Sequence, residues 1–178
     1  MDGLVEFAYA VGNIFAVLLP VFCYLGAMVL FLVGVWGLRR QSQPDNPFRA
    51  KPWVPWLSLI LCGFLASFDR ILTMANATGG STVTVSVGAL TSYVPPANPG
   101  GGVVGATPTE TLVNVVTIFA PFFQAFGALA CLFALLAWRS TAVGTSRRPQ
   151  SASAVQFVFG ILLINCITVS QWVAGLFA

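Results

Sequence analysis

Four long apolar segments alternate with polar loops along the 178 residues of this chain. Each segment reaches about 20 residues, which is the length that an α-helix needs to cross a hydrocarbon core about 30 Å thick. We therefore predict four transmembrane helices, at residues 17–38, 53–74, 112–138 and 154–178. The expected fold class is an all-α integral membrane protein.

The segment before the first span has a pattern of its own. Apolar residues recur at helical spacing, for example at Phe7, Val11 and Ile14, with polar or small residues between them. Residues 1–16 are therefore predicted to form an amphipathic helix at the outer membrane interface. Pro20 is expected to kink the chain as it enters the first span.

The longest polar interval, residues 75–111, separates the second span from the third and is predicted to be a small extracytoplasmic loop domain. Residues 81–87 alternate polar and β-branched apolar side chains, a pattern typical of a short strand. The following stretch is rich in Pro and Gly and is expected to be irregular. Thr109, followed by Glu110, indicates a capped helix start for the third span.

Composition agrees with this interpretation. The chain is 57% hydrophobic and 7% charged, whereas a soluble domain has about 25% charged residues. It has no His, which is the commonest general base and transition-metal ligand. We expect no catalytic site, no metal and no cofactor, so the chain is not predicted to be an enzyme. A bound phospholipid is compatible with the sequence.

The basic residues are concentrated in two short loops, at residues 39–52 and 139–153. Short loops rich in Lys and Arg remain in the cytoplasm, so both termini are predicted to be extracytoplasmic. Eight bases in all are too few and too clustered for sequence-specific nucleic-acid binding. Seven of the eight lie in these loops: Arg39, Arg40, Arg49, Lys51, Arg139, Arg147 and Arg148.

Small residues in the third and fourth spans predict close helix packing, at Gly127, Ala130, Ala134 and Gly160. Asn165, near the middle of the fourth span, is expected to face protein rather than lipid and to need a protein partner there. We predict that these residues help the chain to form a homo-oligomer. The alternative is that they pack only within the monomer.

Asp69 and Arg70 lie near the outer end of the second span. Adjacent residues of a helix point about 100° apart, so the two side chains do not pair directly with each other. We expect them to pair at the outer rim with a neighbouring helix or subunit. Conduction of ions or protons is a less favoured interpretation.

Several segments resemble those of a known family in their order along the chain and in their local sequence motifs. They include NIFAVLLPVFCYLGAMVLFLVGVWGLRR, VPWLSLILCGFLASFDRIL and VVTIFAPFFQAFGALACLFALLAWR, with FVFGILLINCITVSQWVAGLF at the end. The motif most specific to this family lies in the last segment and consists of Gly160, Ile161, Leu162, Ile164 and Asn165. The chain resembles the IcmC/DotE family of type IVB secretion systems and the related TraQ-type conjugation proteins. This resemblance implies an inner-membrane structural component of a DNA- or protein-translocating machine, with other apparatus subunits as partners.

Three classes of function remain open from the sequence. The first is a structural, oligomerising membrane subunit of a type IV secretion or conjugation apparatus. The second is a pilin-like subunit that polymerises from the membrane into an extracellular filament. The third is a small channel or transporter, for which midplane charges or broken helices in matched repeats would be expected.

Overall fold

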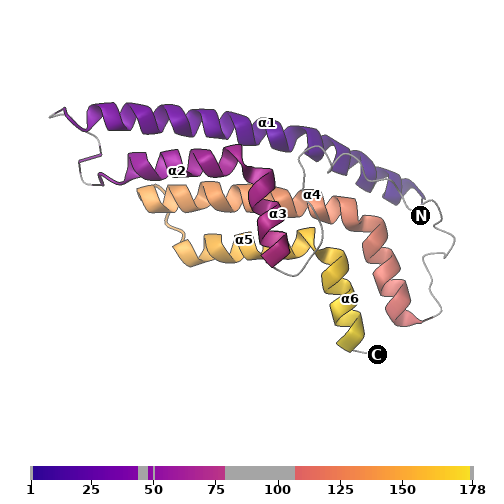
Figure 1. The fold of residues 1–178 in the computed structure, drawn as a ribbon. Coiled ribbons are helices and arrows are strands. Elements are labelled where there is room, and N and C mark those ends of the chain that lie inside the picture. The colour runs from indigo at the N-terminus through magenta and orange to yellow at the C-terminus, as the bar shows by residue number, and fades with distance from the viewer. Residues whose placement is uncertain (1, 44–47, 50, 79–106, 177–178) are drawn as a thin grey trace.

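The chain forms six helices in the part described by the computed structural model, which covers residues 2–43, 48–49, 51–78 and 107–176 (Figure 1). All regular secondary structure in these residues is helical, so the predicted all-α fold class is confirmed there. The helices are α1 (Asp2–Arg40), α2 (Val54–Ala66), α3 (Phe68–Thr78), α4 (Pro108–Val143), α5 (Gln150–Ile164) and α6 (Cys166–Leu176).

The two halves of the chain share one plan (Figure 1). Each half begins with a long helix, α1 or α4, and continues with a bent pair of shorter helices. The pair α2–α3 bends by 79° and the pair α5–α6 by 82°. A single residue separates the helices of each pair, Ser67 in the first and Asn165 in the second. The sequence analysis did not predict this repeat.

The bends correct two of the predicted spans. Residues 53–74 and 154–178 were each expected to form one transmembrane helix, and the structure divides the described part of each into two helices. α2 is almost wholly apolar, whereas α3 brings in Asp69, Arg70 and Thr73. By turning at Ser67, α3 buries one face against the bundle, with Arg70 exposed and Asp69 half-buried.

Two helices, α1 from Ala10 and α4, are long and apolar enough to cross a membrane. The number rises to four if each bent pair counts as one span. Apolar helices of this kind are compatible with a membrane protein.

One continuous helix crosses the boundary predicted between an interfacial segment at residues 1–16 and the first span, and the boundary itself stays a prediction. α1 runs without interruption for 39 residues, with Pro20 inside it. An internal proline removes one backbone hydrogen bond, and tertiary packing can offset that loss. Leu19 and Cys23, on either side of Pro20, are almost fully buried in the core, which holds this part of α1 in place.

The start of α4 is fixed by a capping box at Thr107. Its hydroxyl accepts a hydrogen bond from the Glu110 backbone, and the Glu110 carboxylate accepts one from the Thr107 backbone. The cap predicted at Thr109 is therefore two residues too late, although the role of Glu110 in the first turn is confirmed. The N-terminal part of α4 turns away from the rest of the helix and runs beside α6 (Figure 1). Pro121 lies inside α4.

The core is formed where α1, α2, α4 and α5 run side by side. α1 presents a stripe of buried residues to the other helices, among them Leu19, Cys23, Ala27 and Leu30. Closer to its C-terminus, α1 approaches α2 very tightly. A Cβ at Gly34 would lie 2.7 Å from the Leu59 side chain, and one at Gly37 would lie 2.7 Å from Pro55.

Only the two ends of the predicted loop domain, residues 75–111, can be compared with the structure. Residues 75–78 belong to α3, and residues 107–111 to the cap and first turn of α4. The strand expected at residues 81–87 lies outside the described residues.

Candidate functional site at the helix junction and the basic end

α4 and α5 cross most closely at Gly127 and Gly160. A Cβ at Gly127 would lie 2.6 Å from the Gly160 carbonyl oxygen and 2.9 Å from the Ile164 backbone nitrogen. A Cβ at Gly160 would lie 2.7 Å from the Gly127 carbonyl oxygen. Because these neighbours are backbone atoms, the crossing requires glycine at both positions.

The other predicted packing residues lie along the same interface. Ala134 is buried, and the Ala130 carbonyl oxygen accepts a hydrogen bond of 3.3 Å from Gln156 of α5. The Cys131 thiol donates to the Phe157 carbonyl oxygen at 3.5 Å. The structure therefore brings together Gly127, Ala130, Ala134 and Gly160 inside one chain, as the monomer-packing alternative expects. A role of these residues between chains stays a prediction.

Asn165 occupies the break between α5 and α6, and its side chain joins the two halves of the molecule. Its Nδ2 donates to the Asn76 Oδ1 of α3 at 2.9 Å and to the Ile161 carbonyl oxygen at 3.1 Å. Asn76 is fully buried and Asn165 is 7% exposed. The sequence analysis predicted a protein partner for Asn165 but missed Asn76. The four-residue spacing of Phe68, Leu72 and Asn76 was the signal that places Asn76 on a buried face.

Three buried polar atoms have no hydrogen-bond partner among the described residues: Thr141 Oγ1, Ser153 Oγ and Asn165 Oδ1. A buried polar atom without a partner carries an energetic cost of about 1–3 kcal/mol. Such atoms mark places where a water molecule or a ligand would be stabilising.

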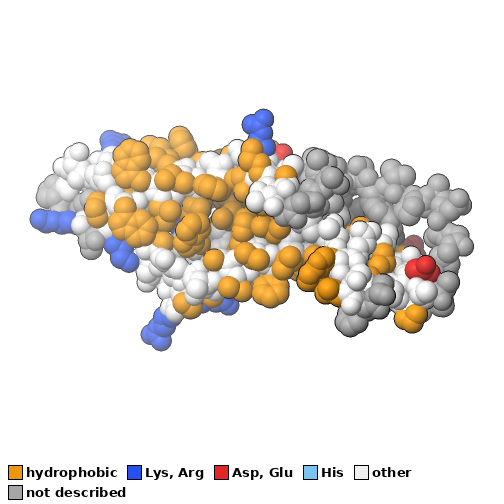
Figure 2. Space-filling view, turned by 60° about the horizontal axis from the view of Figure 1, so that its bottom comes forward, with side chains coloured by type: hydrophobic (Ala, Val, Ile, Leu, Met, Phe, Trp, Pro, Cys, Tyr) orange, Lys and Arg blue, Asp and Glu red, His pale blue; other side chains and the backbone are white. Residues whose placement is uncertain are grey.

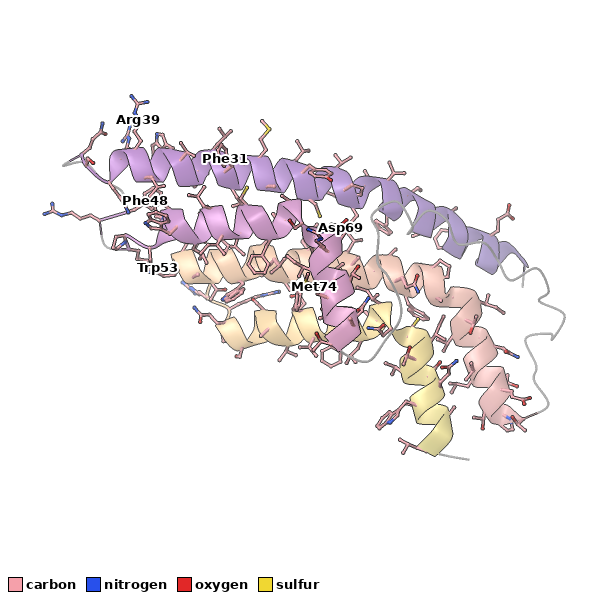
Figure 3. The ribbon with its side chains drawn as sticks, in the orientation of Figure 1. Phe31, Arg39, Phe48, Trp53, Asp69 and Met74 are labelled. Carbon is pink, nitrogen blue, oxygen red and sulfur yellow. The ribbon has the colours of Figure 1, made fainter. Side chains whose placement is uncertain are left out.

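Asp69 and Arg70 lie at the start of α3, at the elbow where it leaves α2 (Figure 3). Asp69 Oδ1 accepts a hydrogen bond of 2.8 Å from the Arg70 backbone nitrogen. An acidic side chain in the first turn interacts favourably with the helix dipole. Arg70 is exposed. Their pairing with another subunit stays a prediction.

The two predicted basic loops meet at one end of the molecule, where Lys and Arg side chains gather (Figure 2). Arg39, Phe48 and Trp53 lie at this end, where α1 finishes and α2 begins (Figure 3). The first turn of α1 and the last turn of α6 lie toward the opposite end (Figure 1). We call the end with the loops at residues 39–52 and 139–153 the basic end.

Lys51 and Arg139 join different segments of the chain at the basic end, whereas Arg40 packs within α1. Lys51 Nζ donates to the Val143 carbonyl oxygen at 2.9 Å and so caps the C-terminus of α4. Arg139 Nε lies 3.4 Å from the hydroxyl oxygen of the buried Ser58. The Arg40 guanidinium lies 4.7 Å from the centre of the Trp36 ring. The four remaining bases have exposed side chains: Arg39, Arg49, Arg147 and Arg148.

The described residues contain no group of three or more Cys, Asp or Glu side chains placed to hold a metal ion. Comparisons of this chain with protein-family models, with curated proteins and with solved structures each found no match.

Proposed function

We propose that this chain is a structural, oligomerising inner-membrane subunit of a type IVB-like secretion or conjugative DNA-transfer apparatus. Two features support the proposal: the apolar helices, and the resemblance of four segments to the sequence motifs of the IcmC/DotE family. In this arrangement the basic end faces the cytoplasm, both termini are extracytoplasmic, and the partners are further copies, other apparatus subunits and membrane lipids.

The observation that carries the assembly proposal is the length of α1. Its 39 residues extend over about 58 Å at 1.5 Å per residue. A hydrocarbon core about 30 Å thick accommodates only about 32 Å of a helix at the average tilt of about 20°. Since Arg39 and Arg40 hold one end of α1 at the basic end, the remaining length of about 26 Å, or about 17 residues at its N-terminal end, extends beyond the opposite side of the core.

This projecting part of α1 carries exposed apolar side chains. Phe7 is 63% exposed, Ile14 58% and Val17 62%. Lipid tails do not cover side chains outside the hydrocarbon core, and exposed apolar patches of this kind mark protein contacts. We therefore assign the assembly surface to the N-terminal part of α1, since the α4–α5 crossing is already used inside the chain.

Cross-linking in native membranes tests the assembly surface. In a variant without native cysteines, Phe7→Cys should give oxidised dimers and higher species. Phe159→Cys, equally exposed at 62% but on α5, serves as the matched control and should stay monomeric. Equal cross-linking at both positions, or none at Phe7, would contradict this surface.

The apparatus assignment needs a cellular test. Deletion of the gene should abolish transfer of DNA or protein, and the wild-type chain should restore it, whereas Phe7→Glu should not. Normal transfer in the deletion strain would refute the assignment.

A second candidate function, a small channel or transporter, is favoured by the matched bends. Transporters often place their binding sites at discontinuous helices in corresponding positions of two repeats. The bends of 79° and 82° occupy such positions, and Asn165 with Asn76 supplies buried polar groups there. Flux of small solutes through proteoliposomes that is lost in Asn165→Leu would favour this function over the structural one.

A further inference from the structure

A groove of about 520 Å³ lies between the two halves of the bundle. α2 and α3 contribute Phe64 and Ile71 to its lining, α4 contributes Leu135, and α5 contributes Phe157. These side chains are apolar. The groove follows α5 from Gln150 to Val158, a distance of about 12 Å at the helical rise of 1.5 Å per residue.

One end of the groove is polar and is formed by the first turn of α5, with Gln150, Ser151 and Ser153 in its lining. Ser153 is only 4% exposed, and its Oγ has no hydrogen-bond partner among the described residues. A buried hydroxyl that lines a groove and lacks a partner indicates that a ligand atom or a water molecule belongs there. The Ser153 hydroxyl is therefore the group of this groove that most clearly calls for a ligand atom as hydrogen-bond partner.

The same helix start favours negative charge. The residue at its N-cap, Pro149, provides no side-chain hydrogen bond, and the first turn contains no acidic residue. The free backbone N–H groups of a helix N-terminus attract anions. Arg147 and Arg148, both exposed, lie immediately before Pro149 and add positive charge at the basic end.

We propose that this groove binds one phospholipid with an anionic headgroup. An acyl chain lies along Phe64, Ile71 and Phe157, and the phosphate lies at the first turn of α5. The Ser153 hydroxyl donates its hydrogen bond to an ester or phosphate oxygen of the lipid.

Two features favour a lipid over a peptide as the occupant. Val155, Val158 and Phe159 of α5 are exposed apolar side chains beside the groove, so it opens toward the hydrocarbon of a bilayer. The polar end of the groove lies at the basic end, where cationic pockets between membrane helices bind anionic headgroups. This site is independent of the proposed assembly through α1.

Native mass spectrometry of the full chain tests the site. Delipidated protein in detergent is titrated with phosphatidylglycerol and with phosphatidylcholine that carry identical acyl chains. The wild type should hold one phosphatidylglycerol in a saturable adduct and bind phosphatidylcholine at least about tenfold more weakly, since only the first has a net negative headgroup.

Two Ala→Phe variants form a matched pair. Ala154 lines the groove, whereas Ala152 lies in the same turn of α5 and is exposed without lining it. Ala154→Phe fills the groove and should abolish the saturable adduct, and Ala152→Phe should keep it. Ser153→Ala removes one oxygen without adding volume. This variant should lower the affinity for phosphatidylglycerol about fivefold, which corresponds to the loss of one hydrogen bond. It also keeps the test valid if Ala154→Phe does not fold.

Equal binding of the two lipids by the wild type would mean annular lipid only and would overturn the proposal. Retention of the adduct by Ala154→Phe, or wild-type affinity in Ser153→Ala, would overturn it as well.

Discussion

The close crossing of α4 and α5 predicts that Gly127→Ala destabilises the fold. The new Cβ would lie 2.6 Å from the Gly160 carbonyl oxygen and 2.9 Å from both the backbone nitrogen and the Cγ1 of Ile164. Two of these neighbours are backbone atoms of a helix, so α5 as a whole must move to make room. Overpacking of this kind costs about 1–3 kcal/mol.

Gly63→Ala is the matched control, because nothing lies within 4 Å of a Cβ at that position of α2. There the substitution should stabilise the protein by about 0.5–1 kcal/mol, through the higher helix propensity of Ala. Thermal unfolding of the purified protein in detergent should place the midpoint of Gly127→Ala several degrees below the wild type and that of Gly63→Ala at or above it. Equal midpoints for the two variants would refute the close crossing.

Three further predictions concern individual hydrogen bonds of the structure. Asn165→Leu removes the buried hydrogen bond to Asn76 Oδ1 and should lower the free energy of unfolding by about 0.5–1.5 kcal/mol. A double-mutant cycle with Asn76→Leu measures this coupling, and additive effects would contradict the bond. Lys51→Met removes the cap on the Val143 carbonyl and should cost about 0.5–1 kcal/mol in thermal unfolding, whereas exposed Arg49→Met should be neutral. Thr107→Ala should lower the local stability of the first turn of α4 by about 1 kcal/mol, so that backbone amide hydrogens exchange faster there. Unchanged exchange would argue against the capping box.

The hydrophobic pattern predicted the helical class of the described residues correctly. This success has a simple cause, since long apolar segments with charged loops satisfy their backbone hydrogen bonds as helices. Gly127 and Gly160 were singled out from the sequence as small residues that allow two helix backbones to approach, but the sequence did not show that they meet each other.

The bends at Ser67 and Asn165 were missed because neither position carries a local helix breaker such as Gly or Pro. Packing decides both bends: α3 buries Phe68, Leu72 and Asn76 after its turn, and hydropathy averaged over a span does not report such a change of direction. At Pro20, where a kink was predicted, α1 continues as a helix, and the kink itself stays a prediction.

The partner of Asn165 was missed for a related reason. Asn76 is 89 residues away in sequence, in a helix that was assigned partly to a loop. A single sequence contains no signal that joins two amides so far apart. The groove between the halves depends on the same bends, since Ile71 of α3 contributes to its lining.

The number of copies in the assembly extracted from its own membrane tests the central claim most directly. The full chain is released from native membranes in lipid nanodiscs formed by an amphipathic polymer, without detergent, and is imaged by electron cryomicroscopy. The account predicts a closed assembly of several copies, with the N-terminal part of α1 buried between neighbours around Phe7. A monomer with Phe7 uncovered, in discs that contain no other subunit, would contradict it.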